Sequence, residues 1–456
     1  MMEESARQME RPKQQLSLTD AVAIIVGIVI GAGIFRTPAL VAANTDTDTM
    51  FLIAWVLGGL ISLIGGLCYA ELSTTFPSSG GDYHFLSMAY GKSMAFLFAW
   101  ARMSIIQTGS IAVLAFIFGD YLAQVISLGS NSAVLYAAII VIILTALNIA
   151  GIRFSTLAQK IFTLTEVAGV LLVVFVGFFI LPEQQSQPVS TSGTTDTGAA
   201  LGLAMVFVLL TFGGWNEAAY ISAEIKSGRN GMVKAIILSL AIITVVYLLV
   251  NMAFLRVLGH DGVAKADAVG IDLMKQAWGA TGVWLIGLLV ALSALTSVNA
   301  TIFTGARTNH ALGRDSEIFS MLGKWNNQTG GPVNAFLVQG LISLVLISMG
   351  LITRTGFQTI VEYTAPVFWF FFLLVGISLF ILRRKEPLIA RPFRVPLYPV
   401  TPVIFCLSSA YLLYSSIVYT GLGALVGIAV LMLGLGLRFI FQKTNNRIVQ
   451  QLIEKP

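Results

Sequence analysis

Long apolar segments separated by short polar ones dominate the pattern along this chain. A helix needs about 20 mostly apolar residues to cross a bilayer. Stretches of this kind begin near Leu18, Met50, Ser93, Ser132, Thr156, Gly198, Gly231, Ala280, Pro332, Gly356, Thr401 and Gly421. Because charges rarely interrupt them, the pattern predicts twelve transmembrane helices. We therefore expect an all-α, polytopic membrane protein.

The composition agrees with this pattern and excludes other classes of protein. Of the 456 residues, 56% are hydrophobic and only 11% are charged, whereas a soluble domain carries roughly 25% charged residues. This balance excludes a soluble enzyme, a disordered chain and a disulfide scaffold. The histidines His84, His260 and His310 are scattered along the chain. We therefore expect no metal site and no cofactor.

Basic residues are distributed unequally between the two sides of the predicted bundle. With the N-terminus inside, 21 of the 27 basic residues fall on the cytoplasmic side, five fall outside, and Arg102 lies at membrane depth. Cytoplasmic loops carry an excess of Lys and Arg. We therefore expect a multi-pass protein of the plasma (inner) membrane with both termini in the cytoplasm.

The predicted helices fall into two groups of five and a final pair. We expect a cytoplasmic tail at 1–15, five helices in 16–182, an external loop at 183–197, five helices in 198–382, a cytoplasmic connector at 383–400, two helices in 401–441, and a cytoplasmic tail at 442–456. Five prolines between Arg383 and Pro402 predict an extended, lipid-facing connector.

Glycine clusters interrupt two of the predicted helices. Gly31 and Gly33 lie within the first, and Gly213 and Gly214 lie within the sixth. A single pair of this kind is typical of close helix packing. The two clusters, however, occupy corresponding places if the five-helix groups are repeats of opposite topology. Interrupted helices at corresponding positions indicate a transporter binding site near the bilayer midplane.

Such an interruption offers opposite electrostatic poles to a ligand. The first half of the first helix would end in free carbonyl groups near Val29 and Ile30, which suit an ammonium group. The second half would begin with free N–H groups at Ala32 and Gly33, which suit a carboxylate. A zwitterionic α-amino acid matches both poles.

Several motifs also match a known family in the order in which it carries them. They are Gly31-Ala32-Gly33-Ile34-Phe35 with Pro38, Tyr69-Ala70-Glu71-Leu72 with Gly80-Gly81-Asp82-Tyr83, Phe212-Gly213-Gly214-Trp215-Asn216, Ser297-Val298-Asn299 with Arg307, and the connector from Arg391 to Pro399. In these motifs the chain resembles the amino acid–polyamine–organocation (APC) superfamily, and within it the L-type amino acid transporter branch. The resemblance covers nearly the whole chain.

The resemblance implies a LeuT-like fold: two inverted five-helix repeats with broken helices one and six, plus two extra C-terminal helices. It also implies α-amino acid transport by alternating access rather than an enzyme. The substrate carboxylate would meet the N–H groups of Ala32 and Gly33, and the ammonium the carbonyls of Val29, Leu210 and Gly213. Other predicted substrate-binding residues are Ile30 and Gly31 in the interruption and Ser110, Phe212, Trp215 and Asn216 in the pocket wall.

One departure from the family concerns the substrate. Relatives often place an aromatic lid where this chain has Leu210. Leucine offers no cation–π surface for a cationic side chain, and the predicted pocket wall contains no carboxylate. We therefore expect uncharged amino acids as substrates.

A second departure concerns coupling. Relatives commonly carry a lysine where this chain has Glu166, in the position of a sodium ion in sodium-coupled cousins and facing the eighth helix at Ser293 and Ser297. Because burial favours the neutral form of a carboxyl group, Glu166 is a candidate proton carrier. Two alternatives are an ion pair with Arg102 and the binding of a cation such as Na⁺. We favour H⁺ over Na⁺ as the coupling ion.

A third departure concerns partners. Animal L-type relatives are linked to a single-span glycoprotein through a cysteine between helices three and four, whereas the corresponding loop here, Ser127 to Asn131, has none. We therefore expect no disulfide-linked heavy subunit, no nucleic-acid partner, and a self-sufficient prokaryotic transporter. The alternative functions are an amino-acid exchanger without ion coupling and an amino-acid-binding membrane sensor.

Overall fold

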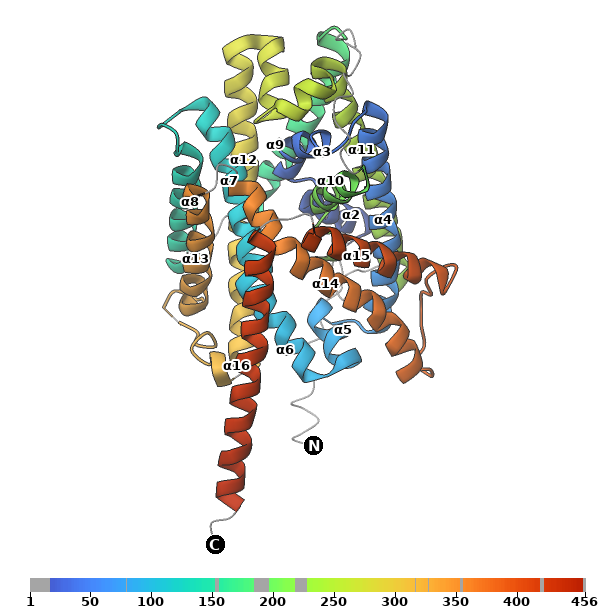
Figure 1. Ribbon diagram of the computed structural model, residues 1–456, viewed down its shortest axis with the longest axis vertical. Coiled ribbons are helices and arrows are strands. Elements are labelled where there is room, and N and C mark those ends of the chain that lie inside the picture. The colour runs from blue at the N-terminus through green and yellow to red at the C-terminus, as the bar shows by residue number, and fades with distance from the viewer. Residues whose placement is uncertain are drawn as a thin grey trace. The chain divides into compact units, whose positions relative to one another are not determined.

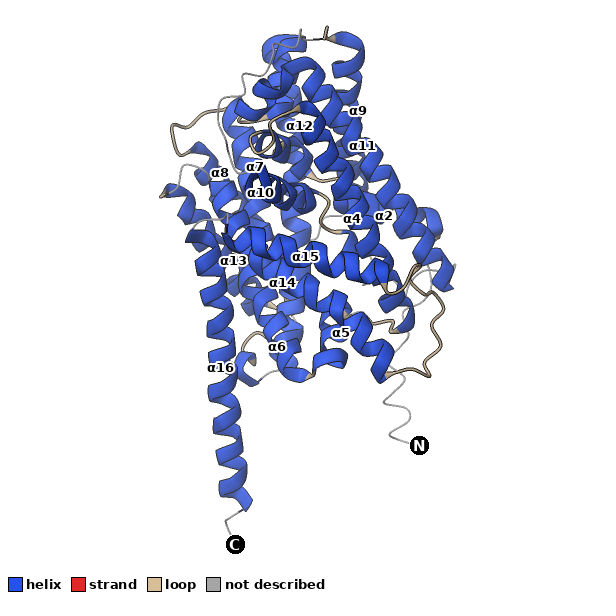
Figure 2. Ribbon diagram, turned by 45° about the vertical axis from the view of Figure 1, so that its right-hand side comes forward, coloured by secondary structure: helices blue, strands red, loops and turns tan. Residues whose placement is uncertain are grey.

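The computed structural model describes residues 17–78, 80–151, 156–183, 197–217, 228–315, 317–326, 328–352, 356–418 and 422–453. Nearly all of these residues are helical (Figure 2). In this part of the chain, extended pairing is limited to one isolated bridge between Asn326 and Gly331. The 3₁₀ and π-helical segments, labelled η, are short.

The helices follow one another in the order drawn in Figure 1. They are α2 (Leu18–Val29), η1 (Ala32–Phe35), α3 (Thr37–Ala42), α4 (Asp48–Thr75), α5 (Gly81–Tyr90), α6 (Lys92–Ala101), η2 (Arg102–Ile106), α7 (Gln107–Val125), α8 (Ser132–Ile149), α9 (Thr156–Phe175), η3 (Val176–Ile180), α10 (Thr197–Thr211), α11 (Gly228–Lys265), α12 (Val269–Asp315), η5 (Glu317–Phe319), α13 (Val333–Ser348), η6 (Met349–Leu351), α14 (Gly356–Lys385), α15 (Val400–Val418) and α16 (Leu422–Ile453).

The helices confirm the all-α, polytopic fold class. Within the described residues, eight helices are long and apolar enough to cross a membrane. Four shorter apolar stretches, Ala21–Phe35, Leu164–Ile180, Leu201–Thr211 and Gly423–Phe439, stand where the first, fifth, sixth and twelfth spans were expected. The two interrupted spans are thus short because their helices stop at the predicted places.

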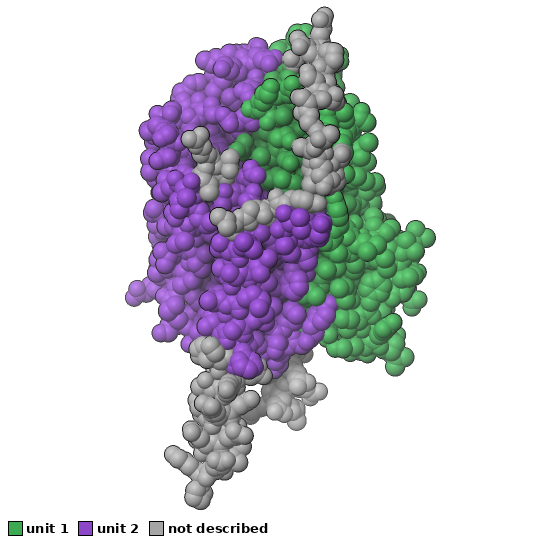
Figure 3. All heavy atoms as spheres, viewed as in Figure 1, with its two compact units in different colours: residues 1–89, 170–265, 372–411 green, residues 90–169, 266–371, 412–456 purple. Residues whose placement is uncertain are grey.

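The chain divides into two compact units that do not follow its order (Figure 3). Unit 1 contains residues 1–89, 170–265 and 372–411, and unit 2 contains residues 90–169, 266–371 and 412–456. Unit 1 therefore holds the first two helices of each predicted repeat, and unit 2 holds the third and fourth of each. Corresponding helices of the two predicted repeats thus fall in the same unit.

In unit 1, α11 packs against α4 and α2. Small residues allow this close approach, since a Cβ atom on Gly59 of α4 would lie only 2.4 Å from Oγ1 of Thr244 in α11. Next to this contact, the rings of Trp55 and Tyr247 pack edge to face with centroids 5.8 Å apart. The Phe212 ring lies 5.0 Å from that of Tyr247. This aromatic cluster fixes α11 beside the second interrupted helix.

In unit 2, α7 packs against α8, α12 and α13. A Cβ atom on Gly119 of α7 would lie 2.2 Å from the carbonyl oxygen of Ala133 in α8. Buried amides connect the same helices, since Gln107 donates to the carbonyl of Thr301 in α12 at 2.9 Å. Side-chain hydrogen bonds of this kind hold helices together where water is absent.

The connector between α14 and α15 is the main non-helical stretch of the described chain. It runs from residue 386 to 399, within the range expected for it. The helix α16 continues to Ile453, into the segment expected to be the C-terminal tail. Most of the expected external loop, residues 184–196, and the whole of the expected N-terminal tail, residues 1–15, lie outside the described residues.

Candidate substrate and coupling sites

The first interrupted helix stops where the glycine pattern predicts. α2 ends at Val29, and the amide of Ile30 still donates to the carbonyl of Val26 at 2.7 Å. Gly31 is then fully extended, with φ −122° and ψ −179°, and the helical path resumes at Ala32 as η1 without a side-chain cap. One helix therefore ends in carbonyl groups next to the first amides of another.

The second interruption follows α10, which ends at Thr211. The chain turns through Phe212, Gly213 and Gly214 before a short 3₁₀ turn at residues 215–217. Gly214 has a φ of +106°, a conformation that side chains rarely adopt. A Cβ atom there would also lie 2.9 Å from Cγ2 of Ile28. Glycine is thus required for conformation and for space, and the contact brings the second interruption against the end of α2.

Tyr247 connects the two interruptions. Its hydroxyl oxygen, on α11, lies 2.7 Å from the carbonyl oxygen of Val29 and 3.0 Å from that of Thr211. These carbonyls end the first halves of the two interrupted helices. Sequence reasoning missed this residue, because a tyrosine inside an apolar helix gives no signal of its role until its partners are known.

A second bond joins the interrupted helices on the other side of the break. The hydroxyl oxygens of Thr37 in α3 and Thr211 in α10 lie 2.6 Å apart, and both residues are buried. Thr37 also donates to the carbonyl of Gly33 at 2.9 Å. The backbone around Gly33 is thereby held in place from two sides.

The structure brings ten of the eleven predicted substrate-binding residues into unit 1. These are Val29, Ile30, Gly31, Ala32, Gly33, Leu210, Phe212, Gly213, Trp215 and Asn216. Phe212, Trp215 and Asn216 are buried, whereas Gly31, Gly33, Leu210 and Gly213 are half-buried. The eleventh, Ser110, belongs to unit 2, where its hydroxyl donates to the carbonyl of Ile106 in the preceding turn at 2.8 Å.

The structure brings Glu166 and Ser293 together within unit 2. Glu166 on α9 is 4% exposed, and the hydroxyl of Ser293 on α12 donates a short hydrogen bond to its Oε1. The helices approach closely beside this contact, since a Cβ atom on Gly169 would lie 2.1 Å from Cδ2 of Leu289. Ser297, one turn further along α12, is half-buried, and its carbonyl accepts the hydroxyl of Thr301 at 2.7 Å.

Among the described residues, Glu166 forms no ion pair with Arg102 in this conformation. In the described part of the chain, Ser293 is the hydrogen-bond partner of the Glu166 carboxyl group, and no ion pair reaches it. Similar depth along two helices does not place two side chains on facing surfaces. Glu166 is therefore a buried carboxyl group whose neighbour is a hydroxyl rather than a cation.

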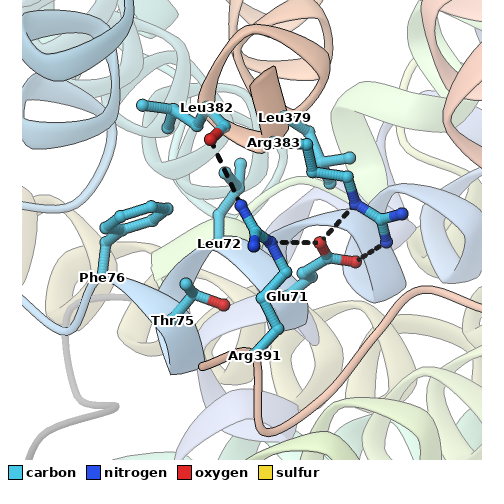
Figure 4. A pocket seen from close by; sticks show the side chains of 8 residues that line it. All are labelled: Glu71, Leu72, Thr75, Phe76, Leu379, Leu382, Arg383 and Arg391. Carbon is cyan, nitrogen blue, oxygen red and sulfur yellow. Dashed lines mark hydrogen bonds and ion pairs between the residues drawn. The ribbon is translucent and has the colours of Figure 1, made fainter. Parts of the chain in front are cut away.

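A different carboxylate, Glu71 at the end of α4, does have cationic partners. Arg383 of α14 donates to both of its oxygens, at 2.7 and 2.5 Å, and Nε of Arg391 lies 3.6 Å from Oε1. The backbone N–H of Val395 donates to Oε2 at 2.7 Å. Figure 4 shows both guanidinium groups directed at this carboxylate.

This cluster explains two of the family motifs. The motif around Glu71 and the connector motif around Arg391 lie more than 300 residues apart in the chain, yet here they contact each other. The contact is structural, since all polar atoms of the Glu71 carboxylate are occupied by the protein's own donors. It therefore holds the connector against α4 and is separate from the helix interruptions.

Comparison with known proteins places these features in a family. A family model described as "Amino acid permease" matches residues 16–437. The b(0,+)-type amino acid transporter 1 of Mus musculus is 28% identical over 412 residues, covering 89% of this chain and 83% of the relative. The Large neutral amino acids transporter small subunit 2 of Mus musculus is 29% identical over 441 residues, covering 94% and 81%.

A further relative extends the similarity to nearly the whole chain. The Asc-type amino acid transporter 1 of Mus musculus is 28% identical over 454 residues, covering 97% of this chain and 84% of the relative. The family and these relatives are transporters rather than enzymes. With interrupted first and sixth helices and a family match over most of its length, this chain belongs to the amino acid permease family of the APC superfamily.

Proposed function

We propose that this protein is a secondary transporter that moves uncharged α-amino acids across the plasma membrane by alternating access. The observation that carries the proposal is the meeting of the two helix interruptions in unit 1, where Tyr247 touches the last carbonyls of both first halves. Interrupted helices that face each other expose backbone poles at membrane depth. An amino acid carries the complementary charges on one carbon atom.

The backbone at the interruptions suggests how the substrate binds. Its carboxylate would accept hydrogen bonds from the N–H groups of Ala32 and Gly33, at the positive start of the resumed helix. Its ammonium group would donate to the carbonyls of Val29, Leu210 and Gly213. Val29 already accepts the Tyr247 hydroxyl, and Leu210 accepts the amide of Gly213 at 3.0 Å. Each carbonyl oxygen has a second lone pair for the ammonium.

Two considerations favour uncharged side chains as cargo. Leu210 offers an apolar surface at the second interruption, and one of the relatives is named for neutral amino acids. The acidic residue nearest in sequence is Glu217, which is half-buried and whose amide donates to the carbonyl of Gly214. A cationic substrate would need such a carboxylate to face the ligand.

A panel of ligands tests the substrate class. The melting temperature of the purified protein is measured with alanine, leucine, phenylalanine, lysine or glutamate, because a ligand that binds only the folded state raises it. We expect stabilisation by one or more uncharged amino acids and none by lysine or glutamate. Stabilisation by lysine that disappears in Glu217→Gln would overturn the assignment to uncharged substrates.

We further propose that Glu166 couples transport to protons. Its carboxyl group is buried, receives one hydroxyl hydrogen bond from Ser293, and has no cation beside it among the described residues. Such surroundings favour the protonated form over the carboxylate, and an ionisable group at membrane depth is a functional candidate. Taking up and releasing a proton there would link the substrate cycle to the proton gradient.

Uptake at two external pH values tests the coupling. We expect acidic external medium to accelerate uptake into proteoliposomes containing the unaltered protein and to have no effect on Glu166→Gln, which should still bind substrate. Ser293→Ala is the matched control, because it removes the hydrogen bond but keeps the titratable group. Unchanged pH dependence in Glu166→Gln would contradict proton coupling, and acceleration by Na⁺ alone would favour cation binding.

Uptake into the same proteoliposomes also distinguishes a proton-coupled transporter from the two alternative functions, an exchanger and a sensor. An exchanger without ion coupling would take up labelled amino acid only when unlabelled amino acid is trapped inside, and a sensor would bind without accumulation. A separate proposal concerns partners. We propose that the protein works without a disulfide-linked subunit, because the loop between α7 and α8 contains no cysteine that could form such a bond.

A further inference from the structure

The connector that follows α14 presents an unusual combination of exposed side chains. Leu388 is 98% exposed and Leu397 is 78% exposed, and both Arg384 and Arg394 are exposed as well. We call these four residues the connector surface. Two large apolar side chains are thus left open on the same segment as two exposed basic ones.

The basic residues around this surface divide into two groups by direction. Arg383 and Arg391 point toward Glu71, as Figure 4 shows, and Lys385 donates to the carbonyl of Ala89 at 2.9 Å. In contrast, Arg384 and Arg394 form no hydrogen bond or ion pair with any described residue. Their two charges are therefore available to a partner outside the chain.

The first group keeps the connector in a defined shape. Arg391 donates to the carbonyls of Leu382 and Glu386 at 3.2 and 2.9 Å. Val395 is buried, and its amide is held by Glu71. Because these bonds fix the backbone on both sides of the surface, a ligand would not need to order it. Binding to a preorganised surface costs less conformational entropy.

The position of the surface identifies the partner. The connector leads directly into α15, whose residues Val400, Val403, Ile404 and Leu407 are 40–64% exposed. Such an apolar helix face belongs in lipid, so the connector lies where the bilayer meets water. Basic side chains interleaved with apolar ones at that level are typical of contact with anionic headgroups, with the apolar side chains entering the acyl boundary.

We propose that the connector surface binds anionic phospholipids of the leaflet at this end of α14. Arg384 and Arg394 contact the headgroup phosphates, and Leu388 and Leu397 insert beside the acyl chains. A free phosphate would gain nothing from the leucines. Half-buried Glu386 is the acidic side chain on the connector itself. It stands against the two exposed arginines of the connector surface, Arg384 and Arg394, so the surface remains basic.

Lipid titration of the full chain tests this proposal. The purified protein in zwitterionic detergent receives phosphatidylglycerol, phosphatidylcholine or soluble glycerol 1-phosphate, and its melting temperature is followed by tryptophan fluorescence. We expect phosphatidylglycerol alone to raise the melting temperature. High salt should reduce this rise in the unaltered protein, since it screens exposed charges.

Two double variants test whether phosphatidylglycerol binds at the connector surface. A basic residue near an anionic surface contributes roughly fivefold in affinity, so R384A combined with R394A should raise the half-saturating mole fraction of phosphatidylglycerol roughly 30-fold. The matched control combines K265A with K275A, two exposed lysines outside the connector, and should leave it unchanged. Equal titrations for both double variants, or equal effects of phosphatidylcholine or glycerol 1-phosphate, would overturn the proposal.

Discussion

At the scale of single residues, one hydroxyl group connects the two helix interruptions of the candidate site. Tyr247 is buried, and its oxygen is within hydrogen-bond distance of carbonyls from two different helices. Since a hydroxyl has one proton, it can donate strongly to only one of them at a time. In the binding mode proposed above, the substrate ammonium group would compete with this hydroxyl for the carbonyl of Val29.

Tyr247→Phe tests this role with minimal loss of volume. Removing the hydroxyl leaves both buried carbonyls without this donor, and we expect the free energy of unfolding to fall by about 1–3 kcal/mol. A lower melting temperature should accompany a raised KM for uptake. Tyr136→Phe is the control, because its exposed hydroxyl bonds only the carbonyl of Ile126 in a loop. Equal stability and KM in both variants would argue against a bridging role.

The residues also show where sequence reasoning reached its limit. Glu166 and Ser293 were predicted as neighbours from the resemblance, and they are in contact. The alternative of an ion pair with Arg102, which this conformation does not form, rested on depth along two helices, and depth says nothing about the direction of a side chain. The role of Tyr247 was missed because aromatic residues in apolar helices usually only fill space.

At the scale of elements, hydrophobic segments and glycines were sufficient to predict the apolar spans and their two interruptions, whereas shorter helices such as α5 were not predicted. The length of the apolar segments predicted the membrane spans, because a helix satisfies all of its backbone hydrogen bonds within lipid. The glycines predicted the interruptions, and at Gly214 the positive φ explains why glycine is needed there. The approach of α11 to α4, however, depends on side-chain packing that a single sequence does not display.

The tie between α4 and the connector gives an element-level prediction. Glu71→Ala leaves Arg383 and Arg391, whose side chains are 19% and 8% exposed, without their carboxylate partner. Removing one partner of a buried ion pair costs roughly 3–5 kcal/mol, so we expect a marked fall in melting temperature and faster proteolysis in the connector.

Glu362→Ala provides the comparison for that variant. Glu362 accepts one bond from Gln358 within the same helix at 3.2 Å, so its loss should cost only about 1 kcal/mol. If the two variants melted at the same temperature, the Glu71 cluster would not be the tie that we describe.

At the scale of the whole molecule, the compact units cut across the order of the chain. Each unit contains corresponding helices of the two predicted repeats, and this grouping could not be obtained from segment lengths alone. To recognise this grouping, we needed the family resemblance, which implies two repeats, and the structure, which shows which helices are in contact.

Membrane orientation is a prediction at this scale. We expect the connector to face the cytoplasm and the end of α13 to face the outside, because basic residues concentrate in the cytoplasm. Ile352, which is 88% exposed after η6, and Ala390, which is exposed in the connector, are suitable for single cysteine substitutions. In intact cells, an impermeant maleimide should label Ile352→Cys and label Ala390→Cys only after permeabilisation. The opposite pattern would invert the topology.

The most direct measurement is uptake of a labelled uncharged amino acid by proteoliposomes containing the unaltered protein or Gly33→Ala. A Cβ atom at Gly33 would lie 3.7 Å from Cγ2 of Thr211, an ordinary contact, so the variant should fold. In the proposed binding mode, its methyl group would stand where the substrate carboxylate approaches the backbone. Gly436→Ala, with no atom within 4 Å of its Cβ, is the matched control. We predict accumulation with the unaltered protein and the control, and a loss of roughly tenfold or more in kcat/KM for Gly33→Ala. No accumulation by the unaltered protein, or full activity of a folded Gly33→Ala, would contradict amino acid transport through the helix interruptions.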